Sequence, residues 1–166
     1  MSTRPAFLLL TALLTALFAC STPESDQRIV AVTPDRASFP PVADLLVHRC
    51  GTLDCHGTRF RNLRLYGHEG LRIDGRPSSR PNTTDTEYDQ DFQSIVGLEP
   101  ELMSTVVTEH GAHPERLTLI RKARGTEHHK GGTLMKEGDM EDLCITSWLA
   151  GRTDRAACMD ARDAAF

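Results

Sequence analysis

The segment from Cys50 to His56 constrains this chain more than any other part of its sequence. Cys50 and Cys55 are separated by four residues, and His56 follows the second cysteine directly. In C-x-x-C-H motifs the two thiols form thioethers with the vinyl groups of a haem, and the adjacent imidazole binds the iron. The same residue types occur here in the same order with a longer spacer. The segment therefore predicts a haem c attached through Cys50 and Cys55, with His56 as an iron ligand.

The N-terminus is typical of an export signal. Arg4 precedes an apolar run, 6–19, of about fourteen residues, whereas a membrane-spanning helix needs roughly 20. The run ends in Ala19 and Cys20, a small residue before a cysteine, which resembles a bacterial lipobox. We therefore expect 1–19 to be a lipoprotein signal peptide and Cys20 to carry lipid. An ordinary cleaved signal peptide and an uncleaved anchor are the alternatives.

The residues after the predicted lipidation site indicate a tether. Residues 20–41 are rich in proline, serine and charge, and a flexible coil of this length spans roughly 25 Å on average. The folded domain is expected to occupy 42–166. This organisation predicts an exported protein, lipid-anchored on the periplasmic side of the cell envelope. Ser21, rather than aspartate, after Cys20 is typical of lipoproteins sorted to the outer membrane.

Apolar spacing predicts an all-α domain with irregular loops. No segment shows convincing β-alternation, and the low aromatic content of 5% is thin for a domain of this size unless a large apolar group joins the core. Helices are expected over 42–50, 84–96, 101–110 and 140–150, with another opened by Pro114. An extended or irregular segment is expected over 58–66, and loops over 67–83 and 125–136.

Two of the five cysteines are left after lipid and haem are assigned. Cys144 and Cys158 belong to an exported chain, which meets an oxidising compartment. A disulfide between them would tie the last expected helix to the C-terminal tail and would stabilise the fold by ~3 kcal/mol in the chain-entropy model. Two buried free thiols are the equal alternative.

The loop over 125–136 supplies candidates for a second axial ligand opposite His56. His128, His129 and Met135 lie in it, and Gly131 and Gly132 allow close backbone approach to a flat ring. Methionine is the conventional thioether ligand, so all three remain candidates at this level.

A resemblance narrows this choice. The segments CGTLDCHG (50–57) and RNLRLY (61–66), the HKGG loop (129–132) and WLAG (148–151) resemble those of exported bacterial cytochrome c-like lipoproteins. The resemblance covers most of the mature chain through short motifs. It implies a small cytochrome c-like helical domain around one covalent haem, with His129 as the distal ligand and His128 and Met135 as alternatives. The four-residue spacer departs from the ordinary cytochrome c pattern.

The function expected is electron transfer rather than catalysis, with redox partner proteins in the cell envelope and the membrane reached through the lipid anchor. The net charge of −4 gives no reason to expect nucleic acid as a partner. Two alternatives stay open: a haem-based sensor or peroxidase-like protein using Arg124 and His128 as distal polar groups, and a zinc site built from Cys50, Cys55, His56 and a loop histidine.

Several nearby side chains have roles to be decided by structure. The arginines 59, 61 and 64 are expected to pair with haem propionates, to form a basic collar for an acidic redox partner, or to be solvated. Tyr66 is a candidate propionate donor or a half-buried packing residue, and Trp148 is expected to help bury the haem.

Overall fold

A computed structural model describes residues 30–67, 70–74 and 82–164. The chain divides into two units, Met1–Val30 and Ala31–Phe166, and the second is described below. The predicted signal peptide, Cys20 and the first part of the predicted tether lie outside the described residues. Within the described ranges, no helix is long and apolar enough to cross a membrane.

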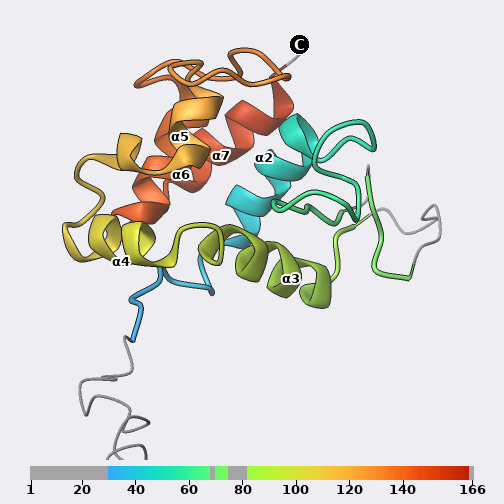
Figure 1. The fold of residues 1–166 in the computed structure, drawn as a ribbon, viewed down its shortest axis with the longest axis horizontal. Helices are drawn as coiled ribbons and strands as arrows, with labels where there is room; N and C mark the ends of the chain where they lie inside the picture. Colours follow the sequence, from blue (N-terminus) through green and yellow to red (C-terminus); the bar gives the residue numbers. More distant parts are fainter. Residues whose placement is uncertain (1–29, 68–69, 75–81, 165–166) are drawn as a thin grey trace, which may run out of the picture. The chain divides into compact units, whose positions relative to one another are not determined.

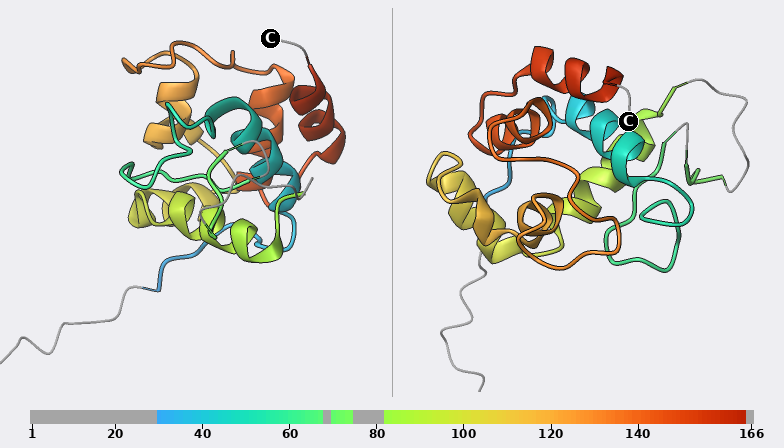
Figure 2. Two further views of the ribbon diagram at one scale, coloured as in Figure 1. Left: turned by 90° about the vertical axis from the view of Figure 1, so that its right-hand side faces the viewer. Right: turned by 90° about the horizontal axis from the view of Figure 1, so that it is seen from above.

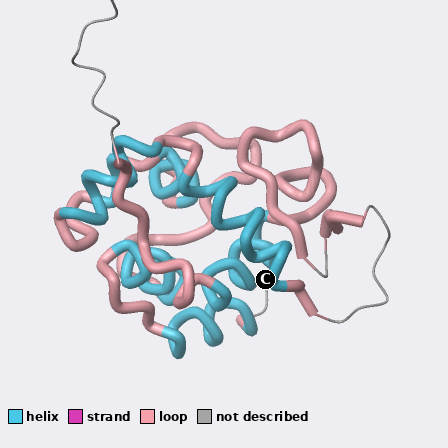
Figure 3. Tube along the Cα trace, turned by 90° about the horizontal axis from the view of Figure 1, so that it is seen from below, coloured by secondary structure: helices cyan, strands magenta, loops and turns pink. Residues whose placement is uncertain are grey.

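The second unit is all-α, as the sequence predicts. Its regular structure is confined to helices and one short 3₁₀ turn, joined by long loops (Figures 1 and 3). Between residue 30 and residue 164, the described residues contain no strand, and the one β-type contact is an isolated bridge between Tyr66 and Leu71. The elements are α2 (Pro40–Cys50), α3 (Asp85–Val96), α4 (Pro100–Thr108), η1 (Pro114–Arg116), α5 (Thr118–Ala123), α6 (Met140–Leu149) and α7 (Arg155–Asp163).

The core is centred on Trp148 of α6. Its indole is fully buried, and its ring lies 5.0 Å from that of Phe39 and 6.2 Å from that of Phe92, between ring centroids. The indole N–H donates a hydrogen bond of 3.0 Å to the backbone carbonyl of Asp35. These contacts join the residues before α2 to α3 and α6, so Trp148 fixes three parts of the chain at once.

The folded unit begins earlier than the sequence indicates. It starts at Ala31 rather than at Val42, because Phe39 is fully buried and the carboxylate of Asp35 accepts hydrogen bonds from the backbone of Ala37 and Ser38. Pro40 opens α2, where a missing N–H costs nothing. The prolines assigned to a tether therefore mark the first turn of a helix.

The C-terminal tail contains a helix that the sequence analysis missed. In α7, the side chain of Asp154 accepts a hydrogen bond from the backbone of Ala157 and caps the first turn. Its buried face consists of Ala157, Cys158 and Ala161, and α7 packs against α2 and α6 (Figure 2). The small size of these side chains hid the apolar stripe, although Asp154 is a recognisable capping signal.

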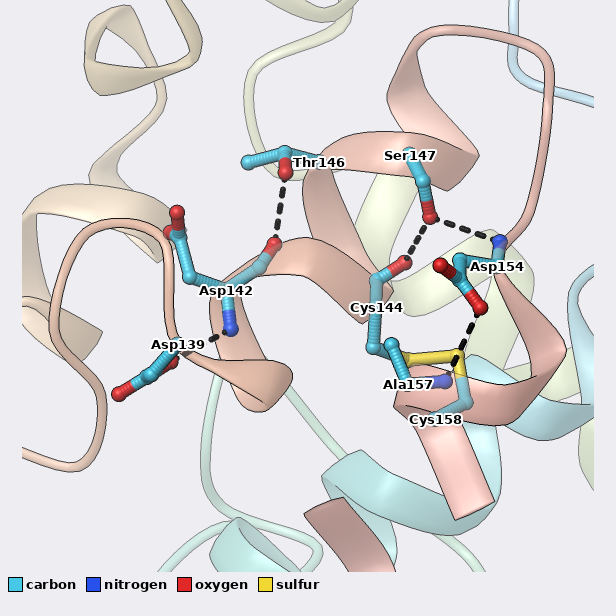
Figure 4. Close-up of a disulfide and its surroundings, with 8 residues drawn as sticks. All are labelled: Asp139, Asp142, Cys144, Thr146, Ser147, Asp154, Ala157 and Cys158. Atoms are coloured by element: carbon cyan, nitrogen blue, oxygen red, sulfur yellow. Dashed lines mark hydrogen bonds between the residues drawn. A yellow bond between two sulfur atoms is a disulfide. The ribbon is translucent and has the colours of Figure 1, made fainter. Parts of the chain in front are cut away.

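Cys144 of α6 and Cys158 of α7 form a disulfide, with 4.6 Å between their Cα atoms (Figure 4). Of the two alternatives that the sequence left open, the structure therefore has the bonded one. Ser147 also links α6 to the start of α7. Its hydroxyl donates to the carbonyl of Cys144 and accepts from the backbone N–H of Asp154. The disulfide and this hydroxyl together hold α7 against α6.

The segment expected to form one helix from Pro114 is split. η1 ends before Leu117, whose ψ of 130° is extended, and α5 starts anew at Thr118. The carboxylate of Glu99, at the start of α4, accepts hydrogen bonds from both the backbone N–H and the hydroxyl of Thr118. A distant side chain thus supplies the cap that the local sequence lacks.

α3 carries a buried acidic side chain in an unusual environment. Asp91 is fully buried; its Oδ1 accepts from the backbone N–H of Tyr66 at 2.7 Å, and its Oδ2 has no hydrogen-bond partner. Burial raises the pKa of Asp91 to about 8, although the Tyr66 hydrogen bond opposes this and the nearby carboxylates of Glu87 and Asp44 add to it. Asp91 is therefore protonated at neutral pH in the folded state.

This environment predicts that stability falls as pH rises. Between pH ~4, where an unfolded aspartate ionises, and about 8, the folded chain keeps a proton that the unfolded chain has lost. The free energy of unfolding therefore decreases across this window. Asp91→Asn preserves an oxygen acceptor for Tyr66 and should remove this part of the slope in urea titrations at several pH values. The control Asp160→Asn, on an exposed position of α7, should retain the parental slope; an unchanged slope in Asp91→Asn would contradict the argument.

Candidate functional site

The residues of the Cys50–His56 segment form a tight turn at the end of α2. The backbone N–H of His56 donates to the carbonyl of Cys50 at 2.9 Å, and the N–H groups of Cys55 and Gly57 both donate to the carbonyl of Thr52 at 2.9 Å. A side chain at Gly57 would place its Cβ 2.0 Å from the carbonyl oxygen of Gly51. The turn therefore requires glycine at 57. Its hydrogen bonds hold His56 beside Cys50, at the end of α2.

His56 is held in one orientation by its own backbone loop. Its Nδ1 lies 3.0 Å from the carbonyl oxygen of Leu63. Because a carbonyl can only accept, Nδ1 carries the proton and Nε2 presents a free lone pair, which is the arrangement of metal-ligating histidines. Burial lowers the pKa of His56; the Leu63 hydrogen bond opposes this, while nearby His129 and Arg61 add to it. The imidazole is therefore neutral at neutral pH, as a metal ligand must be.

The structure brings His129 face to face with His56. The two ring centroids are 6.0 Å apart and the ring planes differ by 20°. The ring of His129 lies over Gly131, where an added Cβ would come within 2.8 Å of its Cε1 atom. The Nδ1 of His129 is buried and has no hydrogen-bond partner. A buried nitrogen of this kind is costly unless another group satisfies it.

A cavity of about 390 Å³ opens beside the two histidines, a volume within the range of small-molecule and cofactor sites. Its walls come from the turn after α2, the segment up to Leu63, one side of α5 and the loop after α5. Most of the lining surface is apolar, although six of the thirteen lining side chains are polar or charged. The lining residues are Cys50, His56, Phe60, Arg61, Asn62, Leu63, Leu98, Thr118, Leu119, Lys122, Ala123, His129 and Leu134.

The two cysteines of the motif are free thiols in this structure. Cys50 lines the cavity. Burial raises the pKa of its thiol to about 12, and the neighbouring Cys55 contributes to the rise, so Cys50 is a protonated thiol at neutral pH. Across the described residues, no three or more side chains of histidine, cysteine, aspartate and glutamate gather where a metal ion would bind. Cys50, Cys55, His56 and His129 therefore lack the convergence of a tetrahedral zinc site.

Other side chains singled out in the sequence lie elsewhere. His128 is exposed and Met135 is buried in the core, and neither lines the cavity. Trp148 packs on Phe39 and Phe92 and Tyr66 borders a different depression. Arg124 forms a bidentate ion pair with the buried carboxylate of Asp142, at 2.8 and 2.9 Å, and does not line the cavity.

One wall of the site was not foreseen. Thr118, Leu119, Lys122 and Ala123 of α5 all line the cavity. Leu119 was recognisable from the sequence as an apolar helix position, but nothing in the local pattern distinguishes a helix face that lines a cavity from one that packs on the core. The structure places this face on the cavity that His56 also lines, and Glu99 anchors the start of α5 there.

Comparisons with protein-family models, with curated proteins and with solved structures found no match for this chain.

The close approach of Gly131 to His129 yields a test of the site geometry. Gly131→Ala should push the imidazole of His129 away from His56, because the added Cβ would lie 2.8 Å from its Cε1. The two-dimensional NMR signals of both imidazole rings should shift together. Gly132→Ala is the matched control, since its Cβ would meet no atom within 4 Å; its φ of +72° costs roughly 1–2 kcal/mol of stability without moving the ring. Equal ring shifts in both variants would contradict the geometry.

Proposed function

We propose that this chain is a membrane-tethered c-type cytochrome that carries one covalent haem and transfers electrons, with a cytochrome c-like arrangement of its all-α domain. The observation that carries the proposal is the pairing of His56 with His129. His56 directly follows the two cysteines, has its Nδ1 anchored on Leu63, and faces His129 across 6.0 Å beside a largely apolar cavity.

The spacing of the two rings suits a shared metal ion. Imidazole nitrogens bind transition metals at about 2 Å, so two imidazoles on opposite sides of one ion have ring centres ~6 Å apart. The 6.0 Å between the centroids of His56 and His129 is close to this value. The two rings are stacked with their planes 20° apart, whereas an imidazole binds a metal end-on through a ring nitrogen, so ligation by both would require one of the rings to turn. The unpartnered, buried Nδ1 of His129 shows in addition that no protein group holds this ring through that atom.

The chain's own residues have distinct roles in the proposed site. Cys50 and Cys55 would supply the thiols for covalent attachment, and the imidazoles of His56 and His129 would hold the iron. A haem bound here would supply an iron that gains and loses one electron. Leu63, Leu98 and Leu119 of the cavity wall exclude water. Arg61 and Lys122 also line the cavity and could pair with propionate groups.

Two protein ligands favour an electron carrier over a sensor or a peroxidase. A protein that binds a small molecule at iron needs an open position and polar groups beside it. His129 already faces His56, and Arg124 is bound to Asp142. The proposed anchoring through lipid on Cys20, and the location on the periplasmic side of the cell envelope, most simply at the outer membrane, rest on the N-terminal sequence.

Covalent haem is the first outcome to test. The full chain, expressed with a c-type haem maturation system, should give a band that stains for haem peroxidase activity on a denaturing gel. Cys50→Ala/Cys55→Ala should lose the stain completely, since no thiol of the motif is left to form a thioether. The disulfide variant Cys144→Ala/Cys158→Ala is the matched control and should keep it. A colourless parent chain would reject the proposed function.

The neighbouring histidines give a matched test of the second ligand. In the oxidised visible spectrum, His129→Ala should convert a low-spin haem to a high-spin one, because an axial ligand is lost. His128→Ala should leave the spectrum unchanged, since this residue is exposed and outside the cavity lining. His129→Met should raise the midpoint potential. A methionine–iron charge-transfer band that persists in His129→Ala would show that another residue is the ligand.

A further inference from the structure

An exposed aromatic side chain lies between arginines next to the candidate site. Phe60 is 95% exposed, and Arg59, Arg61 and Arg64 of the same segment are exposed as well. A large apolar side chain in water gains nothing for the isolated fold. Together with flanking arginines it has the composition that characterises the energetic centre of protein interfaces.

The positive charge of this segment is not balanced within the described structure. The side chains of Arg59, Arg61 and Arg64 have no carboxylate partner among the described residues, and neither do Arg152 and Arg155, whereas Arg36 pairs with Asp89, Arg116 with Glu109 and Arg121 with Glu127. What distinguishes Arg59, Arg61 and Arg64 is that they flank the exposed ring of Phe60. The chain as a whole has a net charge of −4. The uncompensated arginines therefore create a positive patch on a protein that is negative overall, and such a patch orients an approaching partner.

The patch overlaps the rim of the candidate site. A second depression, of about 570 Å³, is lined by Arg59 and Arg64 and by residues of α3. It shares four lining residues with the His56–His129 cavity: Phe60, Arg61, Asn62 and Leu98. Arg59 and Arg64 do not line that cavity, so they are free of any role toward a group bound in it. The segment is fixed in place because the backbone N–H of Arg64 donates to the hydroxyl of Ser94 on α3 at 2.8 Å.

We infer that Arg59, Phe60 and Arg64 form the docking surface for an acidic protein, whose carboxylates meet the arginines and whose surface buries Phe60. Charge complementarity selects this occupant, and the exposed ring adds an apolar contact that a small anion or a solvated face does not need. The docking surface is inferred from charge and exposure alone. Only the statement that the acidic protein is a redox partner rests on the proposed function. Docking here would place the partner against the rim of the His56–His129 cavity.

Binding is tested without any haem-dependent readout. The full chain, in non-ionic detergent, is titrated into a fluorescein-labelled peptide in which aspartates flank a Leu-Val pair, and anisotropy is followed at low ionic strength. Arg59→Glu/Arg64→Glu should weaken binding by roughly tenfold or more, because charge pairs across interfaces are coupled this strongly. Phe60→Ser should also weaken it. Arg152→Glu/Arg155→Glu makes the same change of charge at exposed arginines elsewhere and should change affinity by less than about twofold.

Other outcomes would overturn the inference. No binding of the peptide, or equal losses in the two charge-reversal variants, would show that the patch is not a docking surface. Tighter binding to phosphatidylglycerol vesicles through the same arginines would assign it to the membrane. Displacement of the peptide by pyrophosphate, with no effect of Phe60→Ser, would assign it to small anions. A chain that binds the peptide as expected but carries no haem would reject the proposed function and keep the docking surface.

Discussion

The packing of Trp148 is the constraint on which the helix arrangement depends. Its buried ring contacts Phe39 and Phe92, and its N–H is satisfied by the carbonyl of Asp35. An aromatic side chain of this size buries a large apolar area, and here it joins three segments that are distant in the sequence. The Cys144–Cys158 disulfide then adds α7 to the same assembly. α2 is consequently held between fixed neighbours along its length.

The candidate site lies at the C-terminal end of α2, which these contacts hold in place. Arg49, one residue before Cys50, forms an ion pair with Glu141 at the start of α6, so the end of α2 is anchored where the tight turn to His56 begins. The opposing side of the cavity comes from α5 and from the loop that carries His129. A ligand pair built from a helix-anchored turn and a loop needs such a scaffold, because precise placement depends on rigid supporting elements.

The composition of the cavity agrees with the chemistry proposed for it. The wall is mostly apolar, His56 is kept neutral by burial, and Cys50 remains a protonated thiol. Positive charge lies outside, on the rim and beyond it, where Arg59 and Arg64 remain without carboxylate partners among the described residues. The apolar cavity suits a flat apolar group, and the arginines on the neighbouring surface suit an acidic protein. The two features occupy adjacent depressions that share Phe60 and Arg61.

The sequence by itself determined the all-α class and most helix positions, because apolar spacing and caps are local signals. It also named both histidines that the structure brings together. Only the tertiary structure decided that Phe39 belongs to the core, that α7 exists, that Glu99 caps α5, and that a face of α5 lines the cavity beside His56. Each of these outcomes depends on contacts between residues far apart in the chain, and a local pattern contains no information about which distant side chain will meet it.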